Sequence, residues 1–279
     1  MLKTEIVEKY LSFFVRALKA QSFRLVYIDA FAGSGAFKYV PDESTLGQLF
    51  ESSEGTEHAG SAQRALRLQP AFDKIVFIEK RASNVTALRE LISKSQHKSA
   101  LVEQGDVNQV LKGLCDPRLW RGQRGVIFLD PFGMEVEWET LKLIAATQAL
   151  DLWYLFPLAG TARCLPLNAA KLDQSKRSAM TRVLGTSEWY DAFYQSVDSK
   201  SHDLWGDTVA PSARRKQGLD EIERFVAKRL RTIFPDVAPA KRLHGPRNQQ
   251  LFSLFFTVSN PNPKAITLAR KGADHILKL

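Results

Sequence analysis

The sequence has few cysteines, and they are not arranged as in a metal site. Its 279 residues include 2 cysteines, Cys115 and Cys164, which lie far apart and form no CxxC pair. Its 5 histidines are scattered without the spacing of a ligand set. We therefore expect no disulfide framework, zinc site or iron–sulfur site, and no bound metal. The scarcity of cysteine indicates a reduced protein of the cytoplasm.

Long apolar runs, internal repeats and low-complexity tracts are also missing. Residues 1–21 mix charged and apolar positions in the pattern of an amphipathic helix. They contain neither the apolar region of a signal peptide nor a membrane span of about 18 residues. Because 44% of the residues are hydrophobic, the chain can fill one sizeable core. We expect a single domain over residues 1–279.

The chain carries an excess of positive charge, mostly in its C-terminal half. The formal net charge is +9 and the isoelectric point is about 9.5. Such a basic series suits the phosphate backbone of a nucleic acid. The alternative is the solvated face of a helix, because Glu221 and Glu223 interrupt the series. The candidate nucleic-acid residues are Arg214, Arg215, Lys216, Lys241, Arg242 and Arg247.

Apolar segments alternate with segments of helical period through the first part of the chain. The predicted strands are 24–29, 74–79, 99–104, 125–130 and 149–157. The predicted helices between them are 60–69, 82–95, 107–114 and 137–147. Strand and helix in alternation, with short turns, predict right-handed parallel crossovers. The fold class is therefore α/β, with a doubly wound and mostly parallel sheet.

Two segments interrupt or follow this alternation. Residues 38–59 are polar and poor in apolar periodicity, which predicts an ordered insertion or lid. Residues 158–212 are predicted to form a helical insertion. The expected elements of the second half are helices at about 168–184, 187–196 and 215–233, an antiparallel pair of strands at 237–243 and 251–260, and a last helix at about 264–277.

The first strand leads into a glycine-rich turn, in the sequence YIDAFAGSG. Gly33 and Gly35 allow positive φ and a close approach of backbone N–H groups to a ligand. Asp29 stands at the carboxyl edge of the strand, where open α/β sheets bind ligands. The alternative is an ordinary strand followed by a glycine-rich turn.

Two further acids follow the next two strands. Glu79 ends the second strand and Asp106 follows the third. Carboxylates accept strong hydrogen bonds, so they suit the ribose hydroxyls and adenine amino group of a cofactor such as S-adenosylmethionine. For Asp106 a helix cap is an equal alternative. A dinucleotide fits poorly, because the turn lacks the third glycine and Glu79 lies far beyond the usual spacing of about 20 residues.

The fourth strand ends in FLDPFG, a candidate catalytic motif. Asp130 can accept a hydrogen bond from an exocyclic amino group of a base, and Phe132 offers a stacking face. Pro131 makes the turn rigid and removes an N–H group. The alternative is a common DPxG turn that ends a strand.

With these motifs the sequence resembles the three-Cys-motif partner protein family (TcmP) and, more broadly, the Rossmann-like S-adenosylmethionine-dependent methyltransferases. The resemblance covers about residues 20–160, through DAFAGSG, FIEKR, GDVNQVL and FLDPFG. It implies a seven-stranded sheet and a partner protein with a three-cysteine cluster, radical-SAM-like or phage-related. FLDPFG departs from the DPPY type, with one proline and with Gly133 at an aromatic position. The cofactor contacts implied are Asp29, Phe31, Gly33, Ser34, Gly35, Glu79 and Asp106.

Three functions are compatible with these patterns. The first is a methyltransferase that acts on nucleic acid with Asp130, Pro131 and Phe132 as its catalytic residues. The second is a non-catalytic subunit that uses the pocket to bind a nucleotide or to shape a partner. The third is a nuclease that holds Mg²⁺ with its strand-end acids, although the glycine turn would then have no role.

Overall fold

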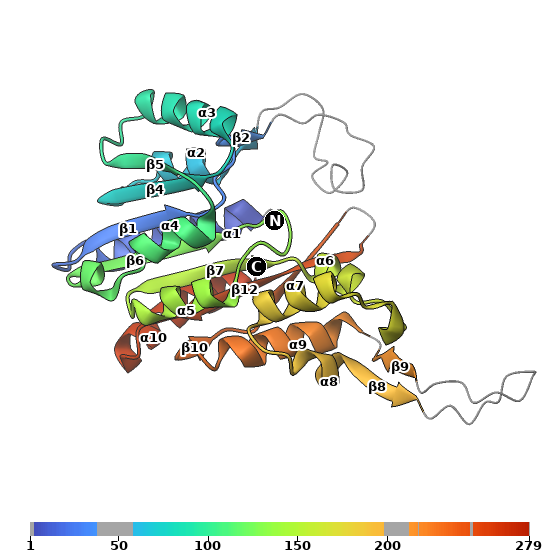
Figure 1. Ribbon diagram of the computed structural model, residues 1–279. Helices are drawn as coiled ribbons and strands as arrows, with labels where there is room; N and C mark the ends of the chain where they lie inside the picture. Colours follow the sequence, from blue (N-terminus) through green and yellow to red (C-terminus); the bar gives the residue numbers. More distant parts are fainter. Residues whose placement is uncertain (1–2, 38–57, 198–211, 217, 246–247, 279) are drawn as a thin grey trace, which may run out of the picture.

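A computed structural model describes residues 3–37, 58–197, 212–216, 218–245 and 248–278 (Figure 1). Its centre is a mixed sheet with helices on both faces. The strands along the main path of this sheet are, in spatial order, β10 (Asp236–Val237), β12 (Gln250–Val258), β7 (Leu150–Phe156), β6 (Gln123–Leu129), β1 (Arg24–Asp29), β4 (Lys74–Glu79) and β5 (Ala100–Gln104).

The pairing confirms the predicted doubly wound, mostly parallel sheet of the Rossmann-like type. β1 runs parallel to β4 and β6, β4 to β5, and β6 to β7, while β12 is antiparallel to β7. The predicted antiparallel pair at the end of the chain is also confirmed, because β10 and β11 (Lys241–His244) both pair with β12. The chain leaves β1 toward β4 and returns on its other side with β6, so a topological switch point lies between β1 and β6. Ligands of open α/β sheets bind at such a point, outside the carboxyl ends of the strands.

The helices pack on the sheet through two apolar clusters, one on each face. Leu25 and Tyr27 of β1 belong to one cluster, and Val26 and Ile28 to the other. Burial on both faces explains why this strand shows no polar alternation in the sequence. On one face lie α1 (Lys3–Leu18), α2 (Ser61–Arg67), α3 (Ala82–Ser93) and α10 (Pro263–Leu277). On the other lie α4 (Val107–Leu114), α5 (Trp138–Ala146), α6 (Leu158–Cys164), α7 (Gln174–Leu184), α8 (Trp189–Phe193) and α9 (Leu219–Leu230).

The helical segment after β7 differs in detail from the prediction. The helix expected at 168–184 is divided into a 3₁₀ helix, Ala169–Lys171, and α7. The division falls at Asp173, whose side chain accepts a hydrogen bond of 2.8 Å from the Lys176 N–H and so begins a new helix.

The prediction of a helix at 187–196 was wrong at its C-terminal end. α8 stops at Phe193, and β8 (Tyr194–Val197) pairs antiparallel with β9 (Ser212–Arg215). The Lys216 N–H donates to the Phe193 carbonyl at 2.7 Å, so the last α8 residue is held by this hairpin rather than by a further helical turn. Arg215, expected to begin a helix, belongs to β9, and α9 begins at Leu219.

The segment predicted as an insertion or lid, 38–59, lies outside the described residues except at its end. Its flanks form a short antiparallel pair, β2 (Ala36–Phe37) with β3 (His58–Ala59). A 3₁₀ helix, Pro117–Trp120, precedes β6. In the described ranges, no helix is both long enough and apolar enough to cross a bilayer.

Candidate functional site

The glycine turn after β1 uses its two glycines for different purposes. Gly33 has φ of +61° and Gly35 has φ of +80°, which only glycine adopts without strain. A Cβ built on Gly33 would have no atom within 4 Å, so this glycine faces open space. A Cβ on Gly35 would lie 2.7 Å from Leu91 Cδ2 and 3.3 Å from Leu88 Cδ2. Gly35 is therefore required by packing against α3, and Gly33 leaves room for a ligand.

A cavity of about 210 Å³, here called the turn hollow, lies beside this turn. It brings together residues from the ends of two neighbouring strands, β1 and β6, at the switch point. Of the residues predicted from the sequence, its wall contains Phe31, Gly33, Ser34, Gly35, Asp130, Pro131 and Phe132. Lys3, Asn84 and Phe252, which the sequence did not indicate, also line it, together with Ser61.

A second cavity of about 610 Å³, here called the acid hollow, adjoins the first. Glu79 and Asp106 line it, so the structure brings the acids that follow β4 and β5 into one site. Phe31 and Phe132 line both cavities. The two hollows share these two rings and lie along the carboxyl ends of β6, β1, β4 and β5, where open α/β sheets bind ligands.

Glu79 is held in place by the backbone and keeps one oxygen for other use. The side chain is buried, with 7% of the residue exposed, and Oε1 accepts the Arg81 N–H at 2.7 Å. Oε2 has no hydrogen-bond partner among the described residues. A carboxylate oxygen in this position is a strong acceptor for hydroxyl groups.

Asp106 caps a helix and lines the acid hollow at the same time. Its Oδ1 accepts the Asn108 N–H at 3.0 Å and thereby begins α4. Oδ2 lies 3.9 Å from Lys80 Nζ, in an exposed ion pair. The cap expected as one alternative is present, and the ligand role stays a prediction.

Asp29 lies beneath the turn rather than in the wall of either hollow. It is fully buried, and Oδ1 has no hydrogen-bond partner within the described part of the chain. Burial raises the pKa of Asp29 to about 7, and the Asp130 charge adds to the rise. The nearby Ser61 hydroxyl, the Phe31 N–H and the Tyr27 hydroxyl act in the opposite direction. Asp29 is next to Ser61, which lines the turn hollow, and its own contact with a cofactor stays a prediction.

Asp130 is tied to the first turn of α1 by an ion pair. Lys3 Nζ lies 2.8 Å from Oδ1 and 2.6 Å from Oδ2, and both side chains are about 15% exposed (14% and 15%). The Lys3 amine is thus already bound to Asp130, the carboxylate that the sequence suggested as an acceptor for the amino group of a base. Phe132 is 70% exposed between the two hollows, with the Arg81 guanidinium 5.9 Å from its ring centre. Its exposure suits a stacking surface rather than a core position.

Asn108 is a positioning residue that the sequence did not reveal. Its side-chain N–H donates to the Glu135 carbonyl at 2.9 Å, and its Oδ1 accepts from the Glu137 N–H at 3.0 Å and from the Thr140 hydroxyl at 2.8 Å. These bonds attach α4 to the loop that follows Phe132. They hold the two sides of the acid hollow together.

Of the basic residues predicted for nucleic acid, Arg214 and Arg215 lie on β9 and Lys241 and Arg242 on β11, two strands that belong to different sheets. Arg214 is exposed and Arg247 lies outside the described residues. The other four bond within the protein: Arg215 to the Ala162 and Leu165 carbonyls (both 2.6 Å), Lys216 to the Asp191 carbonyl (3.0 Å), Lys241 to the Leu277 carbonyl (2.9 Å), and Arg242 to Asp220 (2.6 Å) and Glu223 (3.1 Å). Their role in nucleic-acid binding stays a prediction.

The strand-end acids do not gather as a metal site. Within the described ranges, no group of three or more His, Cys, Asp or Glu residues could hold a metal ion. The nuclease hypothesis therefore has no ligand set in this part of the chain. Cys115 and Cys164 are free thiols, and burial raises the pKa of Cys115 to about 12.

Comparisons with known proteins find similarity in three-dimensional structure only. No protein-family model and no curated protein sequence matches the chain. Among solved structures, protein LPL1258 from Legionella pneumophila str. Philadelphia 1, of family-model DUF519, is 15% identical, with coverage of 98% of this chain and 91% of that one and a TM-score of 0.49. A putative O-methyltransferase from Klebsiella pneumoniae is 11% identical, with coverage of 92% and 81% and a TM-score of 0.45.

A third structure in this comparison, the N-terminal domain of EvdMO1 with SAH bound, is 10% identical, with coverage of 90% and 80% and a TM-score of 0.41. Identities and TM-scores this low describe a shared arrangement of strands and helices. The reading of the site therefore depends on the geometry of this chain's own residues.

Proposed function

We propose that the protein binds S-adenosylmethionine across the turn hollow and the acid hollow and transfers its methyl group to a nucleic acid. The observation that carries the proposal is the meeting of the two hollows at Phe31 and Phe132, above the switch point of the sheet. Open space above Gly33 and the unused Oε2 of Glu79 lie on this same path.

Each part of the site suits one part of such a cofactor. The turn at Gly33 and Gly35 would hold the amino-acid end, through backbone N–H groups that approach closely. Glu79 would accept the ribose hydroxyls, and Asp106 lies on the adenine side. When bound, the cofactor supplies an electrophilic methyl group on a sulfonium.

The chain's own residues would bind and orient the methyl acceptor. Asp130 would accept a hydrogen bond from the attacking amino group, and Pro131 adds no competing N–H. Phe132 would stack on the base. Holding the two reactants in line is worth roughly 7–11 kcal/mol in well-oriented reactions. Lys3 must release Asp130 before an acceptor can bind there.

The choice of nucleic acid and of a protein partner rests on the sequence. The net charge of +9 favours a polyanion. The resemblance of DAFAGSG, FIEKR and FLDPFG to the three-Cys-motif partner family supports, as part of this proposal, a partner with a three-cysteine cluster. The scarcity of cysteine favours, within the same proposal, a location in the cytoplasm.

Calorimetric titration with S-adenosylmethionine, S-adenosylhomocysteine and NAD tests the cofactor assignment. We expect the two sulfur nucleosides to bind and NAD not to bind, because the turn lacks the third glycine of a dinucleotide site. Binding of NAD alone, or of none of the three, would refute the proposal.

Transfer of a radiolabelled methyl group from S-adenosylmethionine to total RNA and DNA tests the reaction. Asp130→Asn should reduce transfer at least tenfold while it leaves the cofactor affinity within about threefold. Asp173→Asn is the matched control, because Asn also caps helices well and Asp173, the N-cap of α7, lines neither hollow.

A second candidate function is a subunit that binds the nucleotide without transferring its methyl group. The ion pair between Lys3 and Asp130 favours it, since both carboxylate oxygens are already used. Tight cofactor binding without transfer, in the protein alone and in Lys3→Met, would support this candidate.

A further inference from the structure

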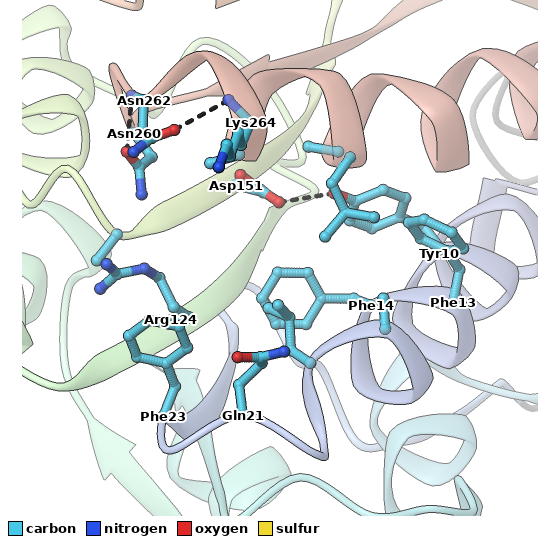
Figure 2. Close-up of a pocket in the computed structure, with 16 residues that line it drawn as sticks. Tyr10, Phe13, Phe14, Gln21, Phe23, Arg124, Asp151, Asn260, Asn262 and Lys264 are labelled. Carbon is cyan, nitrogen blue, oxygen red and sulfur yellow. Dashed lines mark hydrogen bonds between the residues drawn. The ribbon is translucent and has the colours of Figure 1, made fainter.

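A separate pocket lies at the opposite edge of the sheet from the two hollows. Figure 2 shows the residues that line it. It is enclosed by the C-terminal half of α1, the N-terminal half of α10 and the amino ends of β6 and β7. Its volume is about 500 Å³, which falls in the range of roughly 300–1,000 Å³ found for small-molecule sites. We call it the α1–α10 pocket.

Small side chains leave this volume open. Ala17 of α1, Ala149 before β7, and Ala265 and Ala269 of α10 line the pocket where larger residues would fill it. Rings form much of the remaining wall, and Figure 2 shows Phe14 and Phe23 on the side of the pocket facing Asp151. The pocket is therefore mostly apolar, with room for a flat ligand.

Asp151 is an unusual residue for this wall. It lies in a strand whose neighbours are all buried, is 8% exposed, and receives the Tyr10 hydroxyl on Oδ2 at 2.6 Å. Figure 2 shows the other oxygen turned away from Tyr10. Oδ1 has no hydrogen-bond partner in the described residues, and no cation there lies within ion-pair distance of it. An acceptor without a partner in the chain, in the wall of a pocket, suits a hydrogen-bond donor of a bound ligand.

Arg124 occupies the same face of the sheet but does not neutralise this acid. Val126 of β6 is in register with Asp151 of β7, so Arg124, two residues earlier, lies diagonally across from it. The guanidinium stacks on the Phe23 ring at 4.3 Å, and Nη1 donates to the Gln123 carbonyl at 2.6 Å. Arg124 and Asp151 both line the pocket.

We propose that the α1–α10 pocket binds a guanine nucleotide. Guanine presents N–H donors beside the O6 acceptor, so its edge would fill the gap between Asp151 and Arg124. One face of the base would stack on an aromatic ring of the pocket wall, and stacking of this kind is worth about 1–3 kcal/mol. Lys264, at the start of α10, lies in the rim and would meet the phosphate.

Calorimetric titration with guanosine monophosphate tests this site, with saturating S-adenosylhomocysteine present to fill the other edge of the sheet. We expect guanosine monophosphate to bind and adenosine monophosphate to bind at least tenfold more weakly, which corresponds to about 1.4 kcal/mol. Asp151→Asn should weaken binding about tenfold, and Asp173→Asn should not change it.

Ala265→Leu is the second variant, because it fills the pocket without removing a polar group. It should abolish binding while the protein still unfolds cooperatively in a circular-dichroism melt. Equal affinity for both nucleotides, binding that survives Ala265→Leu, or no binding to the wild type would overturn the proposal. Comparison with an oligonucleotide that carries a terminal guanosine 5′-phosphate distinguishes a free nucleotide from a nucleic-acid end as the natural source.

Discussion

Exchanging each glycine of the turn for alanine separates folding from cofactor binding. Gly33→Ala places a methyl group in open space, so its cost is the positive φ alone, about 1–2 kcal/mol. Gly35→Ala has the same backbone cost, and its methyl group would also lie 2.7 Å from Leu91 Cδ2. Overpacking of this kind adds about 1–3 kcal/mol. Gly35→Ala should therefore lower the free energy of unfolding by about 2–5 kcal/mol.

The order is reversed for ligand affinity. The added methyl group at residue 33 would occupy space that the amino-acid end of the cofactor needs to approach the backbone of the turn. Gly33→Ala should therefore weaken S-adenosylmethionine binding at least tenfold. Urea denaturation followed by circular dichroism gives the first quantity, and calorimetric titration at 25 °C gives the second. If Gly33→Ala binds the cofactor like the wild type, or if both variants lose equal stability, the assignment of the two glycines is refuted.

Three further predictions concern buried charge and packing. Burial raises the pKa of Asp151 from 3.8 to about 7, so between these pH values the native state keeps a proton that the unfolded chain has lost. The contribution of Asp151 to the free energy of unfolding is therefore full below pH 4 and falls as the pH rises to 7. Asp151→Asn should remove about 2–3 kcal/mol of the fall in unfolding free energy between pH 5 and 8, measured in urea, and an unchanged pH slope would contradict this. Lys3→Met breaks the part-buried ion pair and should cost about 2 kcal/mol, whereas Lys9→Met on the exposed face of the same helix should change stability by less than about 0.5 kcal/mol; similar losses would argue against the pair. Gly185→Ala would put a methyl group 2.0 Å from Trp138 at φ of +68° and should lower the melting temperature more than any of these changes, a ranking that differential scanning calorimetry checks.

The sequence predicted the parts of the fold that depend on local patterns. β1, β4 and β6 are buried on both faces, so their apolar runs identify them without knowledge of their partners. The glycine turn could also be predicted from the local sequence, because positive φ restricts the residue type. The strand-end acids could be expected to meet, since carboxyl ends of parallel strands share one edge.

Contacts between segments that are distant in the sequence could not be predicted from such local patterns. Nothing near Lys3 indicates a bond to Asp130, which lies 127 positions further on. Phe252 reaches the turn hollow only because β12 lies beside β7. Arg215 was expected on a basic surface, but its guanidinium binds two carbonyl groups around α6. Charge alone could not distinguish these roles.

The position of β12 has a consequence for biosynthesis. This strand is the last in the chain, yet it lies between β7 and β10 and also pairs with β11. Ser259, just after it, bonds to both the N–H and the carbonyl of Leu150, at 3.0 and 2.7 Å. While the ribosome is still adding the final residues, β7 has an unpaired edge, and unpaired strand edges favour aggregation. A premature stop codon before residue 250 should therefore yield insoluble protein rather than a shortened soluble protein.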